Sequence, residues 1–209
     1  MRVLFIGDLR REDLTKPNAY FEYLALKKIY KNIEVIACNK FFLLPSISKR
    51  IFYHISPKIF EPFLNNFILS KIKKKYDLIY VNSTSAAYIG KKLILKLKTK
   101  TKKIIVLLSD NPFVKRDKNR WKLYLDAASY YDLTATYYRS RITMGKKFGI
   151  KNTLLLSPPY QKNVHCKQKI TSREKKKLSS EVVIIGTWFP ERGVFFKKLI
   201  DLGLGIKIY

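Results

Sequence analysis

A strand–helix–strand pattern fills residues 78–109, which read LIYVNSTSAAYIGKKLILKLKTKTKKIIVLLS. Leu78–Asn82 and Ile104–Ser109 are short and mostly apolar, as strands buried on both faces should be. Ala86–Leu97, between them, has the longer apolar spacing of an amphipathic helix. The stretch therefore predicts two parallel strands joined by a crossover helix.

The same alternation continues on both sides of this unit. Further strands are predicted at Arg2–Gly7, Ile33–Cys38, Leu133–Thr136 and Thr153–Leu156, and further helices at Asn18–Ile29, Pro57–Lys74, Arg120–Ala128 and Ser140–Lys147. We therefore expect an α/β, Rossmann-like domain over residues 1–160, with a parallel sheet covered by helices on both faces.

The remaining residues predict a linker and the start of a second domain. Residues 161–180 are polar and strongly basic, so they are expected to form an exposed linker. Residues 181–209 predict one β-α-β unit, with a strand in EVVIIG, a helix at Pro190–Leu202 and a strand at Ile206–Tyr209. So short a unit cannot bury a core of its own, so either it docks onto the first domain or the sequence is a truncated piece of something longer.

Composition gives a packed core and a large positive charge. Hydrophobic residues make up 47% of the chain, whereas 43 Lys and Arg face 15 Asp and Glu, for a net charge of +28. Coding by an A/T-rich genome, with a solvated basic surface, is the favoured explanation of this excess. A partner such as a polyanion or an anionic membrane surface remains the alternative. The segment Phe41–Lys75 also allows two interpretations. We favour a helical insertion packed on the sheet, and the alternative is a segment that lies on a membrane surface.

Several classes of protein are disfavoured by what the sequence lacks. Cys38 and Cys166 do not make a disulfide framework, and we expect no metal held by Cys or His. No apolar run is long enough to span a bilayer or to form a signal peptide, so we expect a cytoplasmic protein, compatible with peripheral contact at the inner membrane face. No dinucleotide fingerprint, P-loop or nucleophile elbow is present.

Polar residues follow the predicted strands at the edge where parallel α/β sheets bind ligands. Gly7 and Asp8 follow the first strand, Asn82 ends the third, Asp110 follows the fourth and Tyr138 lies just beyond the fifth. This edge suits a ligand rich in hydroxyls or phosphates. Asp110, within SDNP, can act as a general base or can cap the local turn, and the residues alone favour the cap.

The passage VVIIGTWFPERGVFFKK, residues 182–198, resembles the start of the second domain in bacterial glycosyltransferases related to the spore-maturation CgeB family. The resemblance rests on the turn formed by Gly186, Thr187, Trp188 and Arg192. The segments VLFIGD, YDLIYVNS, SDNPF and YDLTAT add to it, so that it extends over essentially all 209 residues. It implies the GT-B architecture of two facing Rossmann-like domains. Residues 1–160 would be the amino-terminal one, and residues 181–209 the start of a truncated second, nucleotide-sugar-binding one.

The resemblance implies a glycosyltransferase that moves a sugar from a nucleotide-sugar donor to a sugar or glycoconjugate acceptor, without a cofactor or an obligatory metal. Gly186, Thr187 and Arg192 would contact the donor diphosphate. The acceptor would lie at Gly7, Asp8, Asn82 and Tyr138, with Asp110 as the base. The acidic residue that grips the donor ribose in this family would lie beyond Tyr209, so we expect the chain as it stands to be inactive.

The alternative is a non-enzymatic basic protein that binds an anionic membrane surface or nucleic acid. It would use the basic runs Lys162–Lys177 and Lys71–Lys75. Nucleic acid is the less favoured partner, because aromatic residues are not interleaved with these runs as a stacking platform requires.

Overall fold

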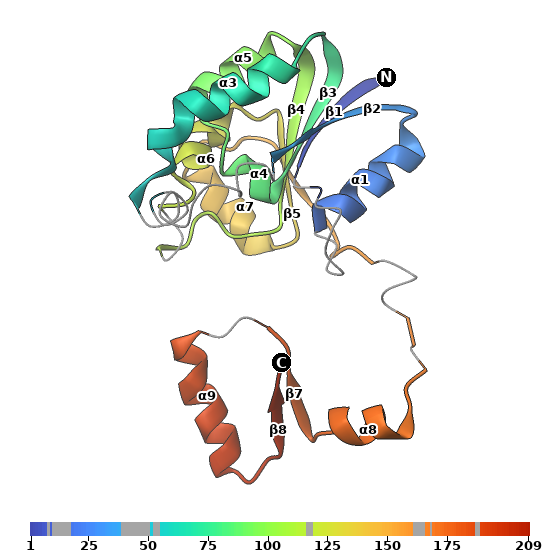
Figure 1. Cartoon of the computed structure of the whole chain (residues 1–209). Helices are drawn as coiled ribbons and strands as arrows, with labels where there is room; N and C mark the ends of the chain where they lie inside the picture. Colours follow the sequence, from blue (N-terminus) through green and yellow to red (C-terminus); the bar gives the residue numbers. More distant parts are fainter. Residues whose placement is uncertain are drawn as a thin grey trace. The chain divides into compact units, whose positions relative to one another are not determined.

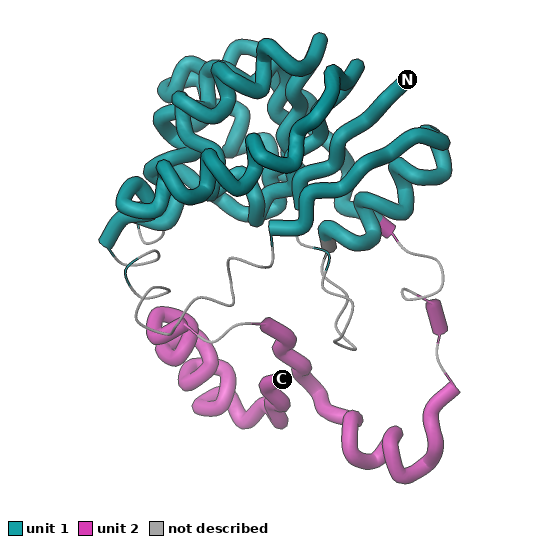
Figure 2. Tube along the Cα trace, turned by 45° about the horizontal axis from the view of Figure 1, so that its top comes forward, with its two compact units in different colours: residues 1–159 teal, residues 160–209 magenta. Residues whose placement is uncertain are grey.

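The computed structural model describes residues 1–7, 9, 18–38, 51, 55–115, 119–160, 166–167, 169–186 and 189–209. The chain divides into two compact units, residues 1–159 and residues 160–209 (Figure 2). Each unit has its own sheet, of six strands in the first and of two in the second.

The first unit is built on a parallel sheet with the strand order β2-β1-β3-β4-β5-β6. Every neighbouring pair of its strands is parallel. The strands are β1 (Arg2–Gly7), β2 (Asn32–Ala37), β3 (Tyr76–Asn82), β4 (Thr101–Leu108), β5 (Leu133–Thr136) and β6 (Thr153–Leu155). The predicted α/β fold class, with a Rossmann-like parallel sheet, is confirmed.

Helices lie on both faces of this sheet (Figure 1). They are α1 (Asn18–Ile29), α3 (Glu61–Lys71), α4 (Ser83–Ala86), α5 (Lys91–Lys98), α6 (Lys122–Ala127) and α7 (Arg139–Lys146), with short 3-10 turns η3 (Pro57–Phe60) and η5 (Ala128–Tyr130). Figure 1 shows α3 and α5 on one side of the strands and α1 on the other.

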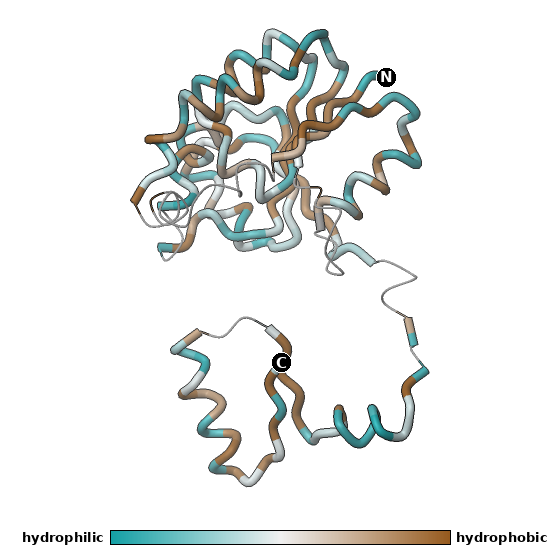
Figure 3. Tube along the Cα trace, in the orientation of Figure 1, coloured by the Kyte–Doolittle hydropathy of each residue, from teal (hydrophilic) through white to brown (hydrophobic). Residues whose placement is uncertain are grey.

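The main core lies between the strands and helices α3, α5 and α6. The register sets Leu4, Ile79 and Ile104 in one row across β1, β3 and β4, and all three side chains are buried. Leu93, Ile94 and Leu97 of α5 are buried in the same cluster, while lysines occupy the exposed side of that helix. Figure 3 shows the hydrophobic residues concentrated in the strands. Removal of this apolar surface from water is the main stabilising contribution.

On the opposite face, aromatic rings join the sheet to α1. The Phe5 ring stacks on Tyr80 of the neighbouring strand, with ring centroids 5.5 Å apart. Tyr23 of α1 meets the same Phe5 ring edge-on, at 5.9 Å. Such ring pairs add to the stabilisation from area burial and fix the position of α1 over β1 and β3.

The prediction of one helix at Ala86–Leu97 was wrong. The structure has the short α4, then an irregular turn, then α5. Gly90 lies in the break, and a Cβ at this position would lie 2.6 Å from Glu61 Oε1 and 3.0 Å from Leu123 Cδ2, so these close contacts favour glycine here. Glycine is also a poor helix former, which accounts for the interruption. The predicted helix at Pro57–Lys74 likewise divides into η3 and α3 and ends at Lys71.

The prediction for Phe41–Lys75 can be followed only in part. Residues 41–50 and 52–54 lie outside the described residues. In the described portion, α3 buries Leu64 and Ile68 in the main core, as a packed helix should. Over α3, the structure therefore agrees with the favoured prediction of a helix packed on the sheet.

The second unit contains a helix and one β-α-β element. Strand β7 (Val182–Ile184) pairs in parallel with β8 (Ile206–Ile208), and α9 (Pro190–Asp201) connects them. Helix α8 (Ser172–Leu178) precedes them, inside the basic segment where the sequence predicted a linker. Its residues are exposed. It starts with a capping box between Thr171 and Glu174, in which each side-chain oxygen accepts a hydrogen bond from the other residue's backbone N–H.

None of the described helices in either unit is long and apolar enough to cross a membrane.

Candidate functional site

The strand order places a topological switch point between β1 and β3. From β1 the chain passes to β2 on one side, and β3 then lies on the other side of β1. In sheets of this kind, ligands bind in the crevice beyond the carboxyl ends of the two strands at the switch. Here these ends are Gly7 and Asn82. This point is the natural centre of the candidate site.

Glu22 of α1 reaches this point from the side. Its Oε2 accepts a hydrogen bond from Asn82 Nδ2 at 2.9 Å and another from the Tyr80 hydroxyl at 3.1 Å. The Glu22 side chain is only partly exposed. The helix thus supplies a carboxyl group to the carboxyl ends of the strands, and the sequence reasoning missed it.

Burial raises the pKa of the Glu22 carboxyl to about 7 from its ordinary value of 4.5, against the opposing effect of the hydrogen bonds from Asn82 and Tyr80. Burial, and then the Glu22 charge, raise the pKa of Tyr80 well above its usual range. They also raise the pKa of Tyr137 to about 12. Glu22 can therefore give or take a proton near neutral pH, while both tyrosines stay protonated.

Asn82 and Gly7, both predicted to contact a ligand, have internal roles in the structure. Asn82 is 2% exposed, and its Oδ1 accepts from the backbone N–H of Thr84 at 3.1 Å, which caps α4. A Cβ on Gly7 would lie 2.1 Å from the Phe5 ring, so glycine is needed here for that ring to stack on Tyr80. Asp8 lies outside the described residues. Asn82 acts on this site by positioning Glu22.

Asp110 lies farther along the same edge, after β4. Its backbone N–H donates to Ser83 Oγ at 3.1 Å, which ties the exit of β4 to that of β3. Its half-exposed carboxylate lies 3.7 Å from Arg120 Nη2. The turn that Asp110 was expected to cap is instead capped by Asn111, whose Oδ1 accepts from the N–H of Phe113.

Arg141 of α7, which the sequence places just beyond the fifth predicted strand, closes this part of the edge. Its Nη1 donates to the carbonyl oxygens of Leu108 at 2.9 Å and Ser109 at 2.8 Å. The guanidinium lies 4.1 Å from the centroid of the Tyr138 ring, which is 54% exposed. Burial lowers the pKa of Arg141, against the opposing charges of Tyr138 and Asp110. A guanidinium against an exposed aromatic ring forms a surface suited to a polar ring with anionic substituents.

The second unit holds the remaining predicted residues. Gly186 has φ +151°, and a Cβ there would lie 3.3 Å from Arg192 Nη1. Arg192, in the first turn of α9, also lies with its guanidinium carbon 4.9 Å from the Phe189 ring centroid. The arginine therefore folds back over the glycine turn. Thr187 and Trp188 lie outside the described residues.

The described side chains include no group of three or more His, Cys, Asp or Glu that could hold a metal ion. Of the two cysteines, Cys38 is buried and Cys166 is exposed.

No protein-family model matches this sequence, and no curated protein matches it at a significant level.

Proposed function

We propose that this chain belongs to a sugar transferase of two Rossmann-like domains. The second unit would contact the diphosphate of a nucleotide-sugar donor, and the carboxyl edge of the first would hold a hydroxyl-bearing acceptor. The observation that carries the proposal is the return of the Arg192 guanidinium to the Gly186 turn, at the amino end of α9. A glycine turn followed by a helix amino end offers backbone N–H groups to phosphate, and an arginine adds charge-assisted hydrogen bonds.

The first unit supports this function through the chemistry at its carboxyl edge. Glu22 can accept a proton near neutral pH, which an acceptor hydroxyl must lose as it attacks the donor. Asp110 was the predicted base, but its carboxylate lies near Arg120. We therefore place Glu22 ahead of Asp110 as the base and assign Arg141 and Tyr138 to acceptor contact.

Calorimetric titration of the whole chain with a panel of nucleoside diphosphates and their sugar esters tests the donor assignment. We expect one of them to bind, and Arg192→Ala to weaken its binding by roughly tenfold or more through loss of a charge-assisted hydrogen bond. Arg173→Ala is the matched control, because Arg173 is an exposed arginine in α8 of the same unit. Equal affinity in the two variants, or no binding across the panel, would count against the proposal.

A further inference from the structure

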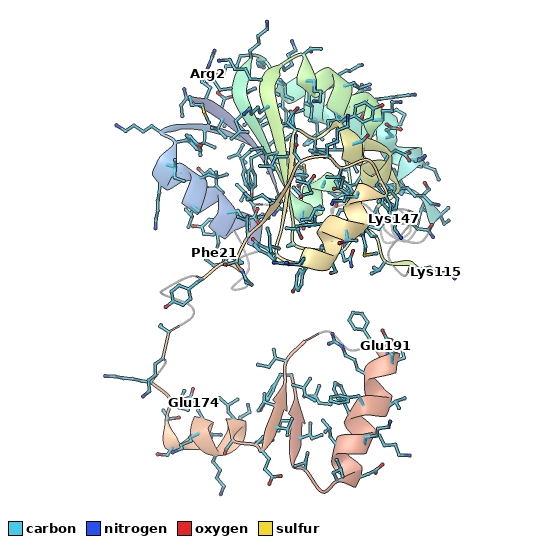
Figure 4. The ribbon with its side chains drawn as sticks, turned by 180° about the vertical axis from the view of Figure 1, so that it is seen from behind. Arg2, Phe21, Lys115, Lys147, Glu174 and Glu191 are labelled. Carbon is cyan, nitrogen blue, oxygen red and sulfur yellow. The ribbon has the colours of Figure 1, made fainter. Side chains whose placement is uncertain are left out.

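The amino ends of four neighbouring strands bring lysines from distant parts of the chain to one edge of the sheet. Lys31 precedes β2, Arg2 opens β1, Lys75 precedes β3 and Lys100 precedes β4. The register aligns Arg2 with Asn32 and Tyr76 with Thr101, so these starts lie side by side. Figure 4 shows Arg2 at this end of the sheet. We call the resulting surface the basic edge; its cations are Arg2, Lys28, Lys31, Lys73, Lys74, Lys75, Lys98, Lys100, Lys102 and Lys103.

Three acidic residues at this edge are already paired. Asp77 lies 3.0 Å from Lys102, Asp132 lies 2.8 Å from Lys98, and Glu34 pairs with Lys74. Lys73, Lys75, Lys100 and Lys103 are exposed, and within the described part of the chain no ion pair involves them. Together with the exposed Lys28 and Lys31, these four lysines give the basic edge a positive charge that faces water.

Two aliphatic side chains project among these cations. Met1 is 61% exposed and precedes Arg2, while Ile29 is 70% exposed and ends α1, three residues before Asn32. The pairing of Arg2 with Asn32 brings these two chain segments together. Exposed aliphatic groups surrounded by lysines are typical of surfaces that contact a lipid headgroup region.

We propose that the basic edge docks on an anionic lipid bilayer. Its lysines meet the lipid phosphates, and Met1 and Ile29 enter the boundary between headgroups and acyl chains. This inference is independent of the proposed function. A bilayer suits the edge better than nucleic acid does, because lysine offers a point charge rather than the planar fork of arginine. Aliphatic Met1 and Ile29 also offer no ring on which a base could stack.

Co-sedimentation of the full chain with vesicles tests this inference. We expect binding to vesicles that contain phosphatidylglycerol and little binding to pure phosphatidylcholine, with affinity falling as salt is added. The combined substitutions Lys73→Gln, Lys75→Gln, Lys100→Gln and Lys103→Gln should weaken binding by roughly tenfold or more. Circular dichroism establishes that the variant folds; if it does not, the pair Lys73→Gln and Lys75→Gln should still weaken binding roughly threefold.

A control variant with the same change in net charge distinguishes the effect of the basic edge from the effect of net charge alone. Lys175→Gln, Lys176→Gln, Lys197→Gln and Lys198→Gln remove four exposed lysines from the second unit, and vesicle affinity should stay within about twofold. Equal losses in the two quadruple variants would overturn the inference, as would absence of binding to anionic vesicles.

The apolar contribution and the competing partner have their own tests. Ile29→Ser should weaken vesicle binding most clearly at high salt, where the charges are screened. A duplex or single-stranded oligonucleotide that binds more tightly than the vesicles, through the same four lysines, would overturn the membrane assignment in favour of nucleic acid.

Discussion

Glu22→Gln should make the protein more stable, and the gain should grow as pH rises. Burial raises the Glu22 pKa to about 7 from 4.5, so the folded state holds the proton at pH values where the unfolded chain has lost it. Below pH 4.5 the group is protonated in both states and costs nothing. Between 4.5 and 7 the free energy of unfolding falls with rising pH, and above 7 the full cost of the buried charge remains.

The shift of about 2.5 units corresponds to roughly 3 kcal/mol, at 1.36 kcal/mol per unit. This is an upper figure, because Glu22 keeps some contact with water. The glutamine cannot ionise, and its amide oxygen can still accept from Asn82 and Tyr80. The variant should therefore exceed the wild type by about 1 kcal/mol at pH 5 and by up to about 3 kcal/mol at pH 8.

Urea unfolding at these two pH values measures the difference. Trp121 is 1% exposed in the first unit, so its fluorescence reports on the unfolding of that unit, and a Trp188→Phe background leaves it as the sole tryptophan. All other titrating groups are common to both proteins and cancel. A gain of the same size at pH 5 and pH 8 would refute the raised pKa, whatever the absolute stabilities.

Two further predictions concern the same unit. Tyr80→Phe removes a hydrogen bond to the Glu22 carboxylate, so the Glu22 pKa should rise above about 7. A carboxyl titration followed by NMR measures this pKa, and an unchanged or lower value would contradict the prediction. Leu93→Ala should lower the free energy of unfolding by about 2–5 kcal/mol, because Leu93 is fully buried between α5 and the sheet; a loss under about 1 kcal/mol in urea would mean that the site is not packed as described.

The strands of the first unit were largely predictable because their apolar runs are short and clear. β5 begins and ends as predicted, and β1 does too. The break before α5 was not predictable, since it depends on Glu61 and Leu123, which are distant in sequence from Gly90. Helix α8 was missed because no apolar stripe marks it. Its one readable signal was Thr171 followed three residues later by Glu174, a spacing typical of helix starts.

The candidate site was predictable as a place rather than as a set of contacts. Strand exits located the carboxyl edge, where Asn82 and Asp110 do lie. Glu22 lies in mid-helix among aromatic residues and acquires its role through Asn82 and Tyr80, which are 60 and 58 residues away. Arg141 likewise depends on residues distant in sequence, because the carbonyl groups that accept its hydrogen bonds belong to Leu108 and Ser109 at the end of β4. A signal for Glu22 did exist in hindsight, as the one acidic residue in α1.

The two edges of the sheet carry charge in physically different states, and the parallel topology keeps them apart. At the basic edge the exposed lysines lie in water and suit a docking surface, whereas Glu22 is partly buried and suits proton transfer. Strand β3 has seven residues, which at about 3.3 Å each places Lys75 and Asn82 roughly 20 Å apart. The lysines at the far end lie in water, where the screening length is about 8 Å at physiological salt, so charge removed from the basic edge should change the Glu22 pKa only slightly. One sheet can thus hold a surface for docking and a site for chemistry, each open to change without disturbing the other.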